Sequence, residues 1–178
     1  MSILLVGNII ERFIVTGFGE HGKDTFCEKF GLPFSSSSWF ACNEFIFDAL
    51  KDKYGYKTPM ECFEDRKSKR VEWYNLIRDY NKGNEIRLAE SLFSKFPVYC
   101  GIRAIDEFNA IKTSHLNGGK LLSIWVDASE RLPPESEGSM TVTKEDCDII
   151  VTNNTTKAEF LAKVQRLSLL LGAVKGNA

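Results

Sequence analysis

Short runs of consecutive apolar residues alternate along this chain with stretches in which apolar positions recur at helical spacing. The first run, from Phe13 to Thr16, is apolar and β-branched, as expected for a strand that is buried on both faces of a sheet. Further strands are predicted at 97–100, 121–126 and 148–152, and a short one at 33–36. Because apolar strands that alternate with helices favour a parallel sheet covered on both faces, we predict an α/β fold, with a five-stranded parallel sheet in three αβα layers.

Helical periodicity fills the intervals between these strands. Thr156 and Glu159 have the spacing of a capping box, which predicts the start of the last helix. The other predicted helices are one that follows the first strand and ends near Gly31, and those from Trp39 to Lys53, from Glu64 to Tyr80 and from Ala104 to His115.

The length of 178 residues predicts one domain with a sizeable core, comprising about 13–34, 97–130 and 143–178. The mostly helical segment 35–96 is predicted to be an insertion in this core. Segment 131–142 is rich in Pro, Glu, Ser and Gly and is predicted to be a lid. Ligands of parallel sheets bind beyond the carboxyl ends of the strands, so we expect the functional site at that edge.

Composition narrows the functional classes. The formal net charge of −1 gives no footprint for nucleic acid. The five cysteines are scattered and form no C-x-x-C pair, which argues against zinc and fits reduced thiols in a cytosol. The apolar run from Ser2 to Val6 lacks a basic leader and is too short to span a bilayer. We therefore expect neither a signal peptide nor a membrane anchor, and predict a cytoplasmic location.

The most specific motif is the segment from Gly17 to Thr25, which has the form G-x-x-x-x-G-K between a predicted strand and a predicted helix. Backbone N–H groups and the helix N-terminus would face a polyphosphate, and Lys23 would reach its terminal phosphates. The alternative is a tight turn that happens to hold spaced glycines and a lysine. The predicted phosphate-binding residues are Gly17, Gly19, Glu20, His21, Gly22, Lys23, Asp24 and Thr25, and for His21 the backbone matters more than the imidazole.

Asp24 stands where Ser or Thr usually follows the lysine and contacts magnesium. The third predicted strand ends at Gly101 and offers no aspartate of the Walker B type. Since Mg²⁺ is hard and prefers oxygen, we predict Asp24 as a relocated metal partner, with Thr25 able to supply a hydroxyl.

A second group of residues is a candidate for holding an anionic acceptor. Arg66, Arg70, Trp73 and Ile77 are spaced four, three and four apart and are predicted to form one stripe of the long middle helix. Guanidinium groups can clamp a phosphate bidentately. The alternative is that 66–70 is a solvated charge run.

Arg103 follows the third strand, and Gly101 before it lets the backbone approach a ligand. We predict that Arg103 serves the acceptor phosphate and that Glu107, one helical turn later, reads donor groups of a base. The alternative for Glu107 is a carboxylate favoured by the helix dipole.

Arg131 opens the predicted lid and would neutralise charge on the transferring phosphate, unless it is an ordinary loop arginine. Trp39, Phe40 and Trp73 could form a wall that stacks on a base, although aromatics at helical spacing are more often core. Asp127 ends the fourth strand, where a structural role is favoured.

These features together resemble the phage-type deoxynucleoside monophosphate kinases. The resemblance rests on the Gly-Lys-Asp-Thr form of the loop, a helical insertion after a short second strand, and Gly-x-Arg after the third strand. It covers the chain from Phe13 to about Leu167. Some phosphomevalonate kinases share the Gly-Lys-Asp form, so the combination is more specific than any one motif. Further matching stretches are Phe63 to Arg66 leading to Arg70 and Trp73, Trp125 to Ser129 leading to Arg131, and Asp148 to Ile150 with Asn153.

The resemblance implies a P-loop kinase-like core, a monophosphate-binding insertion and a lid. It implies Mg²⁺ as cofactor, ATP as donor and a deoxynucleoside 5′-monophosphate as acceptor, with Gly17 to Thr25 on the ATP phosphates, Asn153 near adenine, and Lys23, Arg103 and Arg131 in catalysis. No nucleic acid or membrane partner is expected, and a homodimer is one option. Two alternatives stay open: a kinase for another acceptor such as phosphomevalonate or dephospho-coenzyme A, and a non-enzymatic nucleotide-binding switch. The predicted acceptor-binding residues are Ser38, Trp39, Arg66, Arg70, Trp73, Arg103 and Glu107.

Overall fold

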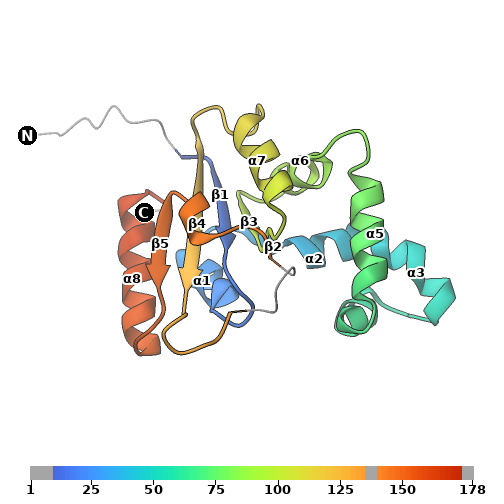
Figure 1. Ribbon diagram of the computed structural model, residues 1–178, viewed down its shortest axis with the longest axis horizontal. Coiled ribbons are helices and arrows are strands. Elements are labelled where there is room, and N and C mark those ends of the chain that lie inside the picture. The colour runs from blue at the N-terminus through green and yellow to red at the C-terminus, as the bar shows by residue number, and fades with distance from the viewer. Residues whose placement is uncertain (1–9, 135–139, 174–178) are drawn as a thin grey trace, which may run out of the picture.

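A computed structural model of the chain describes residues 10–134 and 140–173. Its centre is a parallel sheet with the strand order β2-β3-β1-β4-β5 (Figure 1). The predicted α/β fold with a five-stranded parallel sheet is confirmed, and the arrangement is P-loop kinase-like. The strands are β1 (Arg12–Thr16), β2 (Phe34–Ser36), β3 (Val98–Cys100), β4 (Leu121–Asp127) and β5 (Ile149–Thr152).

Alternate side chains along the strands enter two separate cores. Phe13 and Val15 of β1 pack against α1 (Lys23–Phe30) and α8 (Lys157–Leu170), which lie together on one face of the sheet. Ile14 of β1 and Tyr99 of β3 enter the core on the other face, which includes residues of α7 (Ile105–Thr113) and of the insertion. The inner strands β1, β3 and β4 are buried on both sides, which explains their mostly apolar pattern.

The insertion extends to one side of the sheet (Figure 1). Its first part is helical without interruption, from α2 (Ser37–Ala41) through a π-helical turn, η1 (Cys42–Ile46), to α3 (Phe47–Tyr54), and it agrees with the helix predicted from Trp39 to Lys53. The structure adds two shorter helices that the pattern did not delimit, α4 (Pro59–Glu64) and α6 (Arg87–Phe93).

The single helix predicted from Glu64 to Tyr80 is wrong. The chain leaves α4 through a 3₁₀ turn, η2 (Asp65–Lys67), and α5 (Arg70–Tyr80) begins after a non-helical Lys69 with φ −117° and ψ 23°. The Ser68 hydroxyl donates to the Asp65 carbonyl at 3.0 Å and also contacts its carboxylate. Such local bonds from serine compete with the helical pattern and end it here.

The predicted lid lies partly outside the described residues, because 135–139 are not described. The Arg103 carbonyl accepts the N–H groups of Thr141 (2.9 Å) and Val142 (3.2 Å), so the described end of this segment is fastened to the turn after β3. The Ile105 N–H, at the start of α7, donates to the Thr141 hydroxyl at 2.9 Å. The division into core, insertion and lid remains a prediction.

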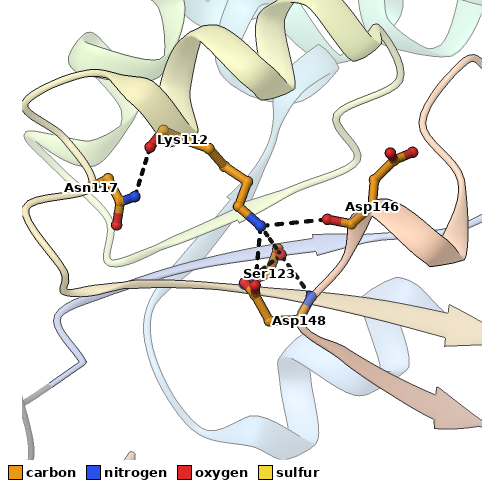
Figure 2. Close-up of polar contacts among 5 residues, drawn as sticks. All are labelled: Lys112, Asn117, Ser123, Asp146 and Asp148. Carbon is orange, nitrogen blue, oxygen red and sulfur yellow. Dashed lines mark hydrogen bonds and ion pairs between the residues drawn. The ribbon is translucent and has the colours of Figure 1, made fainter.

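A polar cluster joins α7, β4 and the residues before β5 (Figure 2). The Lys112 ammonium lies 3.0 Å from the Asp148 carboxylate and also donates to the Ser123 hydroxyl at 3.4 Å. Ser123 is fully buried, and both its N–H and its hydroxyl donate to Asp148, at 2.8 and 2.6 Å. Because buried polar groups need partners, this cluster lets a serine occupy the core face of β4.

The helices of the described ranges include none that is both long enough and apolar enough to cross a membrane.

Candidate active site

The segment between β1 and α1 has the conformation of a glycine-dependent loop. Gly17 and Gly22 have φ values of +141° and +100°. A Cβ at Gly17 would lie 2.5 Å from the Val126 carbonyl oxygen, and one at Gly22 would lie 2.6 Å from the Asn153 amide nitrogen. Both glycines of the motif are therefore favoured by backbone conformation, and at Gly17 a Cβ would also overlap the backbone of β4.

Lys23 is the first residue of α1, and its side chain returns over the loop. Its ammonium donates to the carbonyl oxygens of Gly17 (2.8 Å) and Phe18 (2.6 Å). A cation is thus held beside the N-terminus of α1, where backbone N–H groups also favour an anion. This is the geometry that the predicted phosphate site requires.

The loop is attached to the ends of β4 and β5 by side chains. The imidazole Nδ1 of His21 accepts the Ala128 N–H at 3.0 Å, and the Asn153 side-chain amide donates to the His21 carbonyl at 2.9 Å. The Asn153 carbonyl in turn accepts the Arg131 Nε–H at 2.6 Å. The His21 imidazole therefore has a structural role, which the sequence did not indicate. The predicted contact of Asn153 with adenine stays a prediction.

Asp24 lies in the first turn of α1 and is exposed. The Cys100 thiol, at the end of β3, approaches the Asp24 carboxylate at 3.8 Å. Asp24 thus lies beside the strand end where the sequence lacks an acidic residue. An exposed carboxylate next to a phosphate site suits a hard cation, and Thr25 follows it in the same turn.

Within the described ranges, no three His, Cys, Asp or Glu side chains are grouped closely enough to hold a metal by themselves. A magnesium ion here would therefore need phosphate oxygens and water as additional ligands, which is its usual mode of binding.

Arg66 comes from the 3₁₀ turn of the insertion and reaches the same region. Burial lowers the pKa of its guanidinium, while the nearby charge of Asp24 opposes this and that of Arg70 adds to it. One guanidinium N–H donates to the Phe63 carbonyl at 2.8 Å, and the group lies 3.8 Å from the centre of the Phe63 ring. The predicted helical stripe of Arg66 and Arg70 is wrong, since the helix breaks between them, although the charge of Arg70 still acts on Arg66.

Aromatic side chains pack next to one another beside the Phe63 ring that Arg66 contacts. Trp39 and Phe63 meet edge to face at 5.1 Å, and Phe63 and Trp73 lie 6.4 Å apart. Trp73 and Phe40 are core residues, each 5% exposed, whereas Trp39 is half-buried. Ser38 precedes Trp39 and is also half-buried, so this part of the insertion presents a partly accessible aromatic edge.

The sequence singled out Phe63 only as part of a motif and missed its contact with Arg66. The i, i+3 spacing of the two residues was the available signal for that contact.

The turn after β3 carries Arg103 and leads to Glu107. Gly101 has a φ of +90°, and its N–H donates to the Val15 carbonyl at 2.8 Å, so the turn is anchored to β1. The side chain of Arg103 is exposed. Burial raises the pKa of Glu107 to about 7, against the lowering effect of the 2.9 Å bond from the Tyr99 hydroxyl. Glu107 is therefore a desolvated carboxyl, which differs from an ordinary exposed helix-end carboxylate.

Arg131 and Asp127 lie at the carboxyl end of β4. The Asp127 carboxylate accepts the Ser129 N–H at 3.0 Å, which is the structural role favoured by the sequence. Arg131 is exposed apart from its bond to Asn153. The loop, the Gly101 turn and Arg131 all follow strand ends of one parallel sheet, as predicted.

Comparisons with known proteins assign no activity to this chain. No family model matches the sequence, and no curated protein matches it. One similar solved structure is an unliganded sugar kinase from Janibacter sp. HTCC2649, with 12% identity, a TM-score of 0.45, and coverage of 93% of this chain and 96% of that one.

A second similar structure is a gluconokinase from Sinorhizobium meliloti 1021, with 14% identity, a TM-score of 0.47 and 93% coverage of each chain. Neither similarity is high enough to assign an activity. The strand order and the loop geometry define the class, a P-loop kinase-like α/β fold.

Proposed function

We propose that this chain is an ATP-dependent kinase that transfers a phosphoryl group to a (deoxy)nucleoside 5′-monophosphate. The proposal is supported by two cationic groups that come from different segments. Lys23 is held over the glycine loop, and Arg66 comes from the insertion, where its charge interacts with that of Asp24. A protein that only binds a nucleotide needs one anion site, whereas a kinase with a phosphorylated acceptor needs two.

Phosphoryl transfer depends mainly on alignment and on charge neutralisation. The loop N–H groups and Lys23 would bind the donor phosphates, while Arg66, Arg70 and Arg103 would hold the acceptor phosphate. An oxygen of that phosphate attacks the γ-phosphorus, the bond to the bridging oxygen breaks, and ADP leaves with its electron pair. No strong base is needed, because the acceptor phosphate is already anionic at neutral pH.

Arg131 would neutralise charge on the transferring group. Bound Mg²⁺ would supply further neutralisation of the phosphates, and Asp24 and Thr25 are the residues placed to hold it. The partly accessible edge of Trp39 supports a planar base as part of the acceptor, and Glu107 would contact that base.

A coupled assay of ADP formation tests the proposal across the deoxy- and ribonucleoside monophosphates, with phosphomevalonate and dephospho-coenzyme A as rival acceptors. We expect turnover only with a nucleoside monophosphate. Turnover with a rival alone would change the acceptor class, and ADP release that does not respond to any added acceptor would favour the nucleotide-binding switch.

Lys23→Ala is expected to lower kcat by orders of magnitude with the fold retained. Lys29→Ala, an exposed lysine in the last turn of the same helix, is the matched control and should leave kcat unchanged. Near-normal turnover in Lys23→Ala would refute the phosphate-loop assignment. Arg103→Ala should weaken the acceptor more than ATP, and equal effects would argue against its acceptor role.

A further inference from the structure

His21 is an unusual residue for the interior of a phosphate loop, because its imidazole is fully buried. Its Nδ1 accepts the Ala128 N–H at 3.0 Å, which places the ring proton on Nε2. That Nε2 has no hydrogen-bond partner among the described residues. Burying an unpartnered donor is unfavourable. The benefit of a histidine here therefore lies in the acceptor at Nδ1.

Asn153 forms a second arm between the loop and the sheet. It is 7% exposed, and its side-chain amide donates to the His21 carbonyl at 2.9 Å. Its backbone N–H donates to the Asp127 carbonyl at 2.6 Å, so β4 and β5 are joined at the same point. The side chain of Asn153 thus holds the loop, while its backbone holds the end of β4.

The same residues lead to Arg131. The Asn153 carbonyl accepts the Arg131 Nε–H at 2.6 Å, and the Arg131 N–H donates to the Ala128 carbonyl at 3.0 Å. Two paths therefore run from His21 to Arg131, one through Ala128 and one through Asn153. We call His21, Ala128, Asn153 and Arg131 the loop brace.

We propose that His21 and Asn153 are positioning residues that hold the phosphate loop in its binding conformation and couple it to Arg131. The His21 imidazole bonds Ala128 after β4, and the Asn153 amide bonds the His21 carbonyl, so both side chains act on the conformation of the loop. The coupling to turnover rests on the proposed kinase function, whereas the holding of the loop does not. One experiment below therefore tests the holding of the loop, and another tests its coupling to turnover.

The first experiment measures amide hydrogen exchange in the ligand-free protein. His21→Leu removes the acceptor, while His21→Asn keeps an oxygen at the position of Nδ1. We expect exchange at the loop and Ala128 amides to become about tenfold faster in His21→Leu and to stay near the wild-type rate in His21→Asn, which corresponds to about 1.4 kcal/mol for the opening of the loop.

Equal exchange in His21→Leu and the wild type would overturn the proposal, as would equally fast exchange in both variants. If His21→Leu does not fold, Asn153→Ala provides the same test from the second arm. This measurement does not involve ATP, so its result is independent of the proposed function.

The second experiment measures kcat in the wild type, Asn153→Ala, Arg131→Ala and the double variant, with thermal unfolding followed in parallel. Coupling predicts that the two losses in kcat are not additive, and that the double variant is little worse than Arg131→Ala. Additive losses would refute the coupling to Arg131. Absence of turnover in the wild type would refute the kinase function, and with it this coupling, while the exchange result still decides whether the brace holds the loop.

Discussion

Replacing Gly17 with alanine tests whether the loop conformation is fixed by its contact with β4. Gly17 is buried at the end of β1, with a φ of +141°, and an added Cβ would lie 2.5 Å from the Val126 carbonyl oxygen. Val126 is fully buried in β4 and pairs with Val151 of β5. The obstacle is therefore the backbone of a central strand, which cannot rotate away as a flexible side chain could.

The expected loss has two parts. Holding a residue with a Cβ in this region of φ costs about 1–3 kcal/mol. Relieving the overlap requires a shift of packed backbone, which costs a further ~1–3 kcal/mol. We therefore expect Gly17→Ala to lower the free energy of unfolding by about 2–6 kcal/mol, a large share of the 5–15 kcal/mol that is typical of small domains.

Gly31→Ala is the matched control for this experiment. Gly31 follows the other end of α1 with a φ of +87°, but nothing lies within 4 Å of its added Cβ. It should lose only the backbone term, about 1–2 kcal/mol. Urea unfolding followed by circular dichroism measures both variants. If Gly17→Ala loses no more stability than Gly31→Ala, the argument that β4 fixes the loop fails.

Further predictions concern three carboxyl groups. Burial raises the pKa of Glu107 from 4.5 to about 7, so this carboxyl keeps its proton in the native state at pH values where it loses it in the unfolded chain. The free energy of unfolding should therefore fall by on the order of 3 kcal/mol as pH rises from about 4.5 through 7. Glu107→Gln should remove this pH dependence in urea unfolding at pH 5 and 8, and an unchanged dependence would show that another group causes it. Although burial raises the pKa of Asp148, bonds from Ser123 and Lys112 bring it below its ordinary value. The contribution of Asp148 to the free energy of unfolding should therefore be present above about pH 4 and be lost as pH falls through its native pKa. Asp148→Asn should destabilise the protein less at pH 2.5 than at pH 7, and an equal loss of stability at both pH values would contradict this. Asp24→Ser should raise the magnesium concentration needed for half-maximal turnover, and unchanged magnesium dependence would leave Asp24 without a metal role.

Local patterns were sufficient for the sheet and for the loop. Apolar runs predicted β1, β3, β4 and β5, because strands that are mostly buried hold few polar residues, whereas β2 was predicted only as a short segment and contains two serines. The glycine and lysine spacing predicted the loop, because its left-handed conformations allow few other residues. The capping box at Thr156 and Glu159 is also present as predicted.

The interior of the insertion was harder to predict. Apolar spacing continued through 64–80, and only the local bonds between Ser68 and Asp65 show that the helix ends there. Apolar periodicity indicates which face of a helix is buried. It does not indicate where a side chain forms a local hydrogen bond that ends the helix. As a result, the predicted helical stripe of Arg66 and Arg70 was wrong, and the acceptor role of Arg66 stays a prediction.

The sequence by itself determined the parallel α/β core and the glycine loop, since both depend on residues that are near one another in the chain. Only the tertiary structure decided what the loop rests on. His21 meets Ala128 across 107 positions and Asn153 across 132, and no local signal links residues so far apart. The same holds for Asp24, whose neighbours Cys100 and Arg66 come from β3 and from the insertion. Packing of distant segments at one edge of the sheet is what brings these residues to the loop, and the proposed acceptor site depends on it.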